Sequence, residues 1–357
     1  MQRFYLSLIF ILFCSSVLAG ELKFSGKLST YFDYYKGQTD DISSGNSPVL
    51  DGAGSTTQYT HRKIDFDELE LQVKHKGQLS NGFNTNSVVV LELKSKNTFD
   101  IEEASSSIDN GTIKVSFGIL QDEIKEYYGV AKDAINIGAL EHTMGDEKPA
   151  VRLHYIGLDK LTLDTKARLY EKGTTGSTST SPSRKVTELL LQSAYQDSWG
   201  LVSGSIAYEN DKVINGSQYN SVNSGNKWEH TAKIYNFVLR PKYRIFNPFI
   251  TYTKSISTDR AAKATTAATD TRIYNYILGL DLDAYENLIL TAVYLHQVKY
   301  NYKNRELDAY SLAANYEMKP FEIQLAYSYS KNNASEIVSS NKDYTLSGVR
   351  AYVTYKF

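Results

Sequence analysis

Apolar and polar side chains alternate along most of the chain. Residues 22–29 read Leu-Lys-Phe-Ser-Gly-Lys-Leu-Ser, and 349–357 read Val-Arg-Ala-Tyr-Val-Thr-Tyr-Lys-Phe. Successive side chains of a β-strand point to opposite faces, so a period of two residues indicates strands with one apolar and one polar face. The pattern therefore predicts an all-β protein.

The same alternation predicts sixteen strands. Most exceed the roughly 5–6 residues usual in soluble sheets and match the ~9–11 residues with which a tilted strand crosses a bilayer. The strand at 63–76 changes phase between Phe66 and Leu69, which indicates a β-bulge. The predicted strands are 22–35, 63–76, 82–94, 98–108, 111–119, 149–157, 160–171, 186–197, 199–209, 228–243, 248–257, 272–282, 287–300, 306–318, 321–330 and 343–357.

The connections between these strands differ in length. Those after even-numbered strands are tight, whereas most others are long and polar: 36–62, 120–148, 172–185, 210–227, 258–271 and 331–342. Short turns on one side and longer loops on the other are typical of outer-membrane barrels. An open sheet edge in hydrocarbon would leave backbone groups unpaired, so the strands must close into a ring. The prediction is a closed antiparallel transmembrane β-barrel of about sixteen strands.

The first nineteen residues predict a signal peptide rather than part of the fold. Arg3 precedes an apolar run at 6–13, and Val17-Leu18-Ala19 ends in small residues. The run is shorter than the ~20 residues of a membrane-spanning helix, which disfavours a membrane anchor. We expect cleavage after Ala19, so that 1–19 is the signal peptide and 20–357 is the barrel domain.

Composition narrows the possible functions. The 39 Lys and Arg against 40 Asp and Glu leave no basic surplus for binding nucleic acid. The only cysteine is Cys14, and no paired histidine spacing suggests zinc. We find no catalytic constellation and expect no cofactor, so a barrel enzyme is disfavoured, as is a surface adhesin. Aromatics near strand ends, such as Tyr31, Phe32, Tyr34 and Tyr35, predict interfacial girdles.

Three runs of sequence resemble a known family. The terminal Phe357, in phase with Tyr355 and Val353, resembles the C-terminal signature that the barrel-assembly machinery recognises in outer-membrane proteins. Residues 99–104 followed by 109–118 resemble the run before an inward-folded third loop, and 148–155 resemble the strand that leaves it. The chain is thus similar to the general, non-specific porins of Gram-negative bacteria. The resemblance implies a homotrimer among outer-membrane lipids, with 120–148 folded into the lumen.

The resemblance gives 120–148 the central role in function. The segment holds seven carboxylates and three lysines, and acidic charge at a constriction attracts cations. The alternative is that these charges belong to an ordinary solvated loop. The candidate constriction acids are Asp122, Glu123, Glu126, Asp133 and Glu141.

Basic residues at polar strand positions are expected on the opposing wall. Together with the acidic loop they would set up a transverse field across the pore. The family commonly has an Arg directly after the glycine of its fifth strand, whereas here Ile119 follows Gly118. The candidate basic wall consists of Lys27, Lys74, Lys94, Arg152, Arg168 and Arg350.

These features predict passive diffusion of ions and small hydrophilic solutes, with a mild preference for cations. The alternative within the same fold is a substrate-specific porin for a sugar, phosphate or another anion.

Overall fold

The computed structural model describes residues 20–39, 58–94, 99–120, 127–132, 134–135, 149–172, 184–213, 227–261, 269–300, 305–334 and 344–357. The strands in this part of the chain are β1 (Gly20–Thr39), β2 (Gln58–Gln78), β3 (Asn84–Lys94), β4 (Phe99–Asp109), β5 (Ile113–Ile119), β6 (Pro149–Leu158), β7 (Leu161–Lys172), β8 (Arg184–Asp197), β9 (Gly200–Val213), β10 (Lys227–Pro241), β11 (Phe246–Ala261), β12 (Thr269–Tyr285), β13 (Leu288–Tyr300), β14 (Arg305–Met318), β15 (Phe321–Ala334) and β16 (Tyr344–Lys356).

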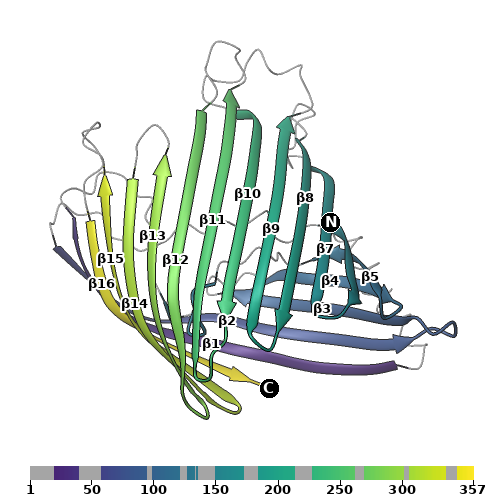
Figure 1. Cartoon of the computed structure of the whole chain (residues 1–357), viewed down its shortest axis with the longest axis horizontal. Helices are drawn as coiled ribbons and strands as arrows, with labels where there is room; N and C mark the ends of the chain where they lie inside the picture. The colour runs from purple at the N-terminus through teal and green to yellow at the C-terminus, as the bar shows by residue number, and fades with distance from the viewer. Residues whose placement is uncertain are drawn as a thin grey trace.

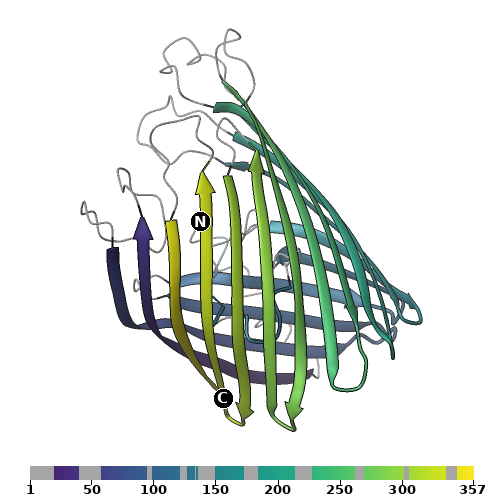
Figure 2. The same cartoon turned by 60° about the vertical axis from the view of Figure 1, so that its left-hand side comes forward.

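The strands form one closed barrel (Figures 1 and 2). Each strand pairs antiparallel with its neighbours in the chain, and β16 pairs with β1 to complete the ring. The predicted closed antiparallel sixteen-strand barrel is therefore confirmed. Among the described residues, no helix is long and apolar enough to cross a membrane.

The predicted bulge is also confirmed. The β1–β2 register shifts between Ser29 and Thr30, where Ser29 lies opposite Glu68 and Thr30 lies opposite Phe66. Asp67 is the extra residue of β2, and its carboxylate reaches the Tyr352 hydroxyl of β16 at 2.5 Å. The bulge thus directs an additional carboxylate toward the seam where the barrel closes.

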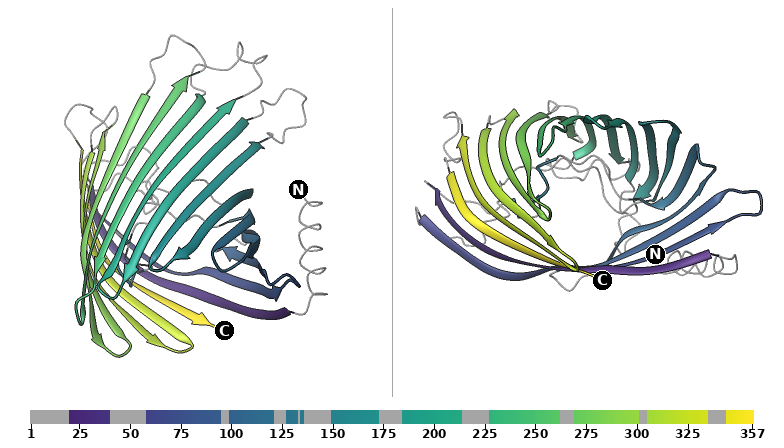
Figure 3. Two further views of the ribbon diagram at one scale, coloured as in Figure 1. Left: turned by 45° about the vertical axis from the view of Figure 1, so that its right-hand side comes forward. Right: turned by 60° about the horizontal axis from the view of Figure 1, so that its bottom comes forward.

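The short connections gather at one rim of the barrel, and the chain ends at that rim (Figures 2 and 3). The turn between β4 and β5 shows how the sequence builds them. The side chain of Asn110 accepts a hydrogen bond from the Ile113 amide at 2.8 Å, and Gly111 takes a φ of 84°. Asn followed by Gly suits this turn because the Asn110 side chain accepts backbone hydrogen bonds and Gly111 takes the positive φ without strain.

The predicted signal peptide lies outside the described residues, and the first strand begins at Gly20. We expect the exported protein to begin with Gly-Glu-Leu-Lys. Edman sequencing or mass spectrometry of the protein purified from outer membranes would check this. An intact Met1 on the membrane-inserted protein would contradict it.

Exposure separates the two faces of the sheet. Large apolar side chains on the outer face are open, for example Phe24 at 72% and Leu312 at 65%. Polar side chains of the inner face are buried, for example Thr253 and Asn275 at 0%. This is the apolar-out, polar-in arrangement that a lipid-embedded barrel requires.

The girdle prediction is wrong for Tyr31 and Tyr35. Both side chains share the inner face with Asp33, and Tyr35 is only 1% exposed. Phe32, in the alternate phase, is 42% exposed on the outside. Neighbouring aromatics on one strand cannot all face lipid, because the side-chain period is two.

The inner face is not polar throughout. On β8–β10 the inward Leu190, Ala207 and Ile234 form an apolar cluster. On β11–β14 a second cluster lies inside the barrel, consisting of Phe249, Ile277, Val293, Leu295, Leu307 and Ala309. The inner wall of β8–β14 therefore holds two local apolar clusters among polar residues, which the alternation rule did not predict.

Candidate pore lining and constriction

The inner wall holds the start of the 120–148 segment at Leu120. The Leu120 carbonyl accepts hydrogen bonds from Arg168 at 3.0 Å and from Lys166 at 3.4 Å, both on β7. Arg168 is 2% exposed and also binds Glu188 of β8 at 2.8 Å. A buried cation needs such partners, so Arg168 serves as an anchor for the segment.

Tyr127 fixes the next described part of the segment to β10–β12. Its hydroxyl donates to Asp281 at 2.5 Å and accepts from Arg240 at 2.8 Å. The Arg240 guanidinium lies 3.7 Å from the ring centroid, and the ring meets Phe249 edge-on at 4.8 Å between centroids. These charge-assisted and cation–π contacts are among the stronger polar interactions in proteins.

Asp281 is the acceptor on which this attachment centres. Besides Tyr127, the Val130 amide donates to it at 3.2 Å and the Thr291 hydroxyl at 2.6 Å. Gly129 sits between these contacts with a φ of +99°, and a Cβ there would lie 2.3 Å from the Thr291 methyl. Only glycine allows the backbone to come this close to the wall.

A short turn continues the attachment toward β14–β16. Ala131 and Ala134 are both fully buried and pack with Ala313 and Ala326 of the wall. The Ala134 amide donates to the Gln324 side chain at 3.2 Å. Small side chains on both surfaces let the backbone lie close to the strands, so the described part of the segment contacts the wall from β7 round to β16.

The predicted constriction acids lie outside the described residues. Asp122, Glu123, Glu126, Asp133 and Glu141 all belong to the parts of 120–148 that the structure does not describe. Their role in the pore stays a prediction.

The predicted basic residues lie on β16, β1–β3, β6 and β7. Four of them have carboxylate partners. Arg152 binds Asp164 at 2.8 Å, and Arg350 binds Asp33 through two hydrogen bonds of 2.6 and 2.7 Å. Lys27 and Arg168 are paired with glutamates as well. Lys74 lies opposite Lys23 on the inner face. The side chain of Lys94 lies outside the described residues.

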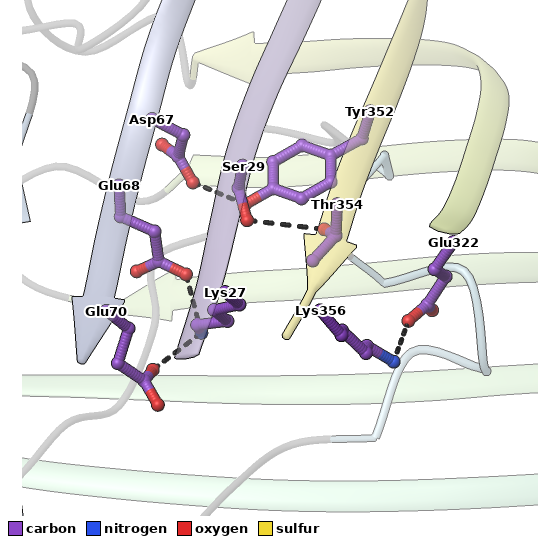
Figure 4. Close-up of polar contacts among 9 residues, drawn as sticks. All are labelled: Lys27, Ser29, Asp67, Glu68, Glu70, Glu322, Tyr352, Thr354 and Lys356. Atoms are coloured by element: carbon purple, nitrogen blue, oxygen red, sulfur yellow. Dashed lines mark hydrogen bonds and ion pairs between the residues drawn. The ribbon is translucent and has the colours of Figure 1, made fainter. Parts of the chain in front are cut away.

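The closing seam between β16, β1 and β2 shows this pairing (Figure 4). Lys27 lies between Glu68 at 2.5 Å and Glu70 at 2.9 Å. Across the seam, the hydroxyls of Ser29 and Thr354 are 3.2 Å apart. One cation facing two carboxylates leaves acidic charge on this wall.

Most of the carboxylates that pair with the basic wall were not predicted from the sequence. The predicted acids all belong to 120–148, although acidic residues also occupy inner-face positions of neighbouring strands. Alternation alone could have placed them, because they are in phase with the predicted basic residues. The inner-face acids of β2–β4 include Glu68, Glu70, Glu92, Asp100 and Glu103, with Asp67 added by the bulge.

The predicted assembly residues Val353, Tyr355 and Phe357 share the outer face. Phe321 and Tyr355 are 5.1 Å apart between ring centroids, and Tyr355 and Phe357 are 5.9 Å apart. The Phe357 backbone exchanges two hydrogen bonds with Gly26 of β1, at 2.8 and 3.0 Å. The last residue therefore takes part in closing the ring.

The described residues contain no group of three or more His, Cys, Asp or Glu side chains placed to hold a metal ion. No family model matches the sequence, and no curated protein matches it.

Solved structures do resemble the barrel along its whole length. The outer-membrane channel DcaP of Acinetobacter baumannii is 14% identical, with 95% of this chain and 97% of that one covered and a TM-score of 0.64. The anion-selective porin of Comamonas acidovorans is 9% identical over 95% and 100% of the two chains, with a TM-score of 0.63. The trimer form of OmpT from Vibrio cholerae is 12% identical over 95% and 100%, with a TM-score of 0.59. The fold is that of Gram-negative outer-membrane porins.

Proposed function

We propose that this protein is an outer-membrane channel for passive diffusion of ions and small hydrophilic solutes, with a mild preference for cations. The observation that carries the proposal is a closed barrel whose inner wall is contacted by residues within 127–132 and 134–135. A segment held there occupies part of the cross-section. We propose that 120–148 as a whole folds inward and narrows the pore.

The charges of the wall support a modest cation preference. The basic residues of the wall are largely neutralised, since Lys27, Arg152, Arg168 and Arg350 each have carboxylate partners. The additional acids of β2–β4 have the same sign as the net charge of 120–148. With these basic residues paired, we expect only a weak transverse field across the pore. One porin of this fold is named as anion-selective, so local residues and not the fold must set the ion preference.

We also propose that the channel is a homotrimer. The support is the structure of V. cholerae OmpT in its trimer form, which has the same fold. Light scattering of the detergent-solubilised protein should give three chains per particle, and a single chain per particle would contradict the trimer.

Neutralising the acidic start of the segment should shift the ion preference. We expect the triple variant Asp122→Asn, Glu123→Gln, Glu126→Gln to move the reversal potential in a KCl gradient toward anions. Charges at a narrow site are the least screened, because the Debye length is about 10 Å at 0.1 M salt. Amides keep the side-chain size, so single-channel conductance should change less than selectivity. The measurement is planar-bilayer recording.

A matched triple variant controls for charge alone. Asp159→Asn, Glu286→Gln and Glu317→Gln remove three carboxylates at or beside the short-connection rim and should leave the reversal potential in place. If both triples shift it equally, 120–148 has no special role at the constriction. Conductance that saturates with one sugar or anion would favour a substrate-specific porin instead.

A further inference from the structure

A group of charges on the inner face of β1 and β2 has an excess of negative charge. Lys27 lies 2.5 Å from Glu68 and 2.9 Å from Glu70, so one ammonium group serves two carboxylates. The strand register continues this row with two further acids, Glu92 on β3 and Asp100 on β4. Among the described side chains, the three charges around Lys27 therefore carry one negative charge more than they neutralise.

A matching group on β15, β16 and the 120–148 segment has an excess of positive charge. Glu322 binds Lys356 at 2.5 Å and accepts a hydrogen bond from Gln324 at 3.0 Å. Lys132, which belongs to the described part of the segment, also acts electrostatically on this carboxylate. Here one carboxylate faces two ammonium groups, so the described charges around Glu322 are the reverse of those around Lys27.

The two groups adjoin where the barrel closes. Lys27 and Lys356 are direct cross-strand partners, and like charges in such positions destabilise a sheet. Figure 4 shows their ammonium groups directed to opposite sides, each toward its own carboxylates. Alternating lysine and glutamate across the same strands would avoid the repulsion. The segregated charges give the seam a local dipole that the stability of the sheet does not require.

This dipole is open to the lumen near the rim of the short connections. The Lys356 side chain is 52% exposed and the Lys27 side chain is 36% exposed. Along β16, both lie on the short-connection side of Tyr352, which packs with Ala131 and Ala134 of the segment. A solute that has passed the segment would therefore meet these charges before it leaves the barrel.

The spacing of the excess charges fits a short peptide. Lys356 and Glu70 are two strands apart, so their backbones are separated by about 9.5 Å at about 4.7–4.9 Å per strand. An extended tripeptide spans about 10 Å, at roughly 3.3–3.6 Å per residue, whereas a free amino acid is too short to reach both. Next to Lys27 and Glu70, Ser25 bonds to Gln72 at 3.3 Å, and both side chains can bond to peptide amides.

We propose that the seam from β15 to β2 holds a subsite for zwitterionic peptides of about three residues. The peptide carboxylate meets Lys356, and the peptide ammonium group meets Glu70. The proposal rests on the proposed function and deepens it, since it names a solute class that the channel retains briefly on its way out. Exposed ion pairs are individually weak, so the subsite delays the peptide without stopping it.

The first test compares triglycine with its capped forms on the wild-type barrel in detergent, by ligand-observed NMR titration. We expect triglycine to bind about threefold or more tightly than N-acetyl-triglycine, triglycinamide or free glycine, because each of these lacks one of the two charges or the length to join them. The comparison needs no variant, so it does not depend on how a variant folds. Equal binding of triglycine and both capped peptides would overturn the proposal.

Two variants assign the peptide termini to their partners. Lys356→Gln should remove the preference for triglycine over triglycinamide and keep the preference over N-acetyl-triglycine, whereas Glu70→Gln should do the reverse. The control, Lys114→Gln with Glu209→Gln, removes one Lys and one Glu from the inner face of β5 and β9 and should keep both preferences. The assignment is wrong if Lys356→Gln and Glu70→Gln behave like this control.

Bilayer conductance of the same samples keeps the two proposals apart. In the wild type we expect brief current interruptions that are more frequent with triglycine than with either capped peptide. A conducting barrel that binds all three peptides alike fails only the peptide subsite. Binding that depends on both free termini, on a barrel that does not conduct, fails only the proposed function.

Discussion

Replacing Asp281 by Ala is expected to widen the channel more than any other single change to its wall. The variant removes the acceptor that Tyr127 and Val130 share, and hydrogen bonds to a charged acceptor contribute about 1.5–3 kcal/mol each. Without them the segment around Gly129 should leave the wall. We expect single-channel conductance to increase by roughly 1.5-fold or more, with larger current noise. Planar-bilayer recording of the purified variant is the measurement.

Asp283→Ala is the matched control for that experiment. Asp283 lies two residues further along the inner face of β12 and accepts a hydrogen bond from Asn247 at 3.2 Å. It therefore tests the loss of an inner-face carboxylate on the same strand without loss of the Tyr127 attachment. If both variants conduct alike, the Asp281 contacts do not hold the constriction. Tyr127→Phe should reproduce a smaller part of the effect, because only the hydroxyl is lost.

The second large effect is expected at the seam that closes the ring. A Cβ on Gly26 would lie 2.6 Å from the Glu70 carbonyl and 2.6 Å from the Phe357 ring. Gly26→Val should therefore displace Phe357 and break the two backbone hydrogen bonds between these residues. We expect most of the variant chains to lose the heat-modifiable mobility of folded barrels on unheated gels. Deleting Phe357 should have the same result.

Two further variants separate closure from recognition by the assembly machinery. Phe357→Tyr keeps the ring and should assemble normally, whereas Phe83→Ala removes an aromatic from a short connection and should also assemble. Refolding of urea-denatured protein into detergent takes place without the machinery. If Gly26→Val refolds as well as the wild type there, the seam contact is not what closes the barrel. If only the Phe357 deletion refolds in detergent as well as the wild type does, Phe357 acts solely as a signal for the assembly machinery.

The strands were predictable because lipid imposes one simple rule on the outer face. Large apolar side chains recur at outward positions from Leu22 to Val353, so alternation located the sixteen strands and the phase change near Phe66 located the bulge. The rule fails where the inner face is apolar too. Leu288–Tyr300 carries Val293 and Leu295 inside as well as Leu290 and Tyr294 outside, and a pattern with apolar residues on both faces does not reveal which side packs against a segment of the same chain.

The attachment of the third loop was not predictable for a different reason. Tyr127 and Asp281 are 154 residues apart, and Ala134 and Gln324 are 190 apart. Neither pair belongs to a motif, so only the closed ring brings them together. The pairing of Arg350 with Asp33 could have been predicted, because both occupy inward positions of strands that must meet when the barrel closes.

The most direct test of the central claim is the conductance of the purified wild-type protein in a planar bilayer under a KCl gradient. We expect stable open channels with ohmic current. We also expect a reversal potential displaced toward the potassium equilibrium potential but well short of it, because the proposed constriction acids of 120–148 would add to the acids of β2–β4, while the basic residues of the wall are mostly paired. A membrane that stays electrically silent, or a reversal potential on the chloride side, would contradict it.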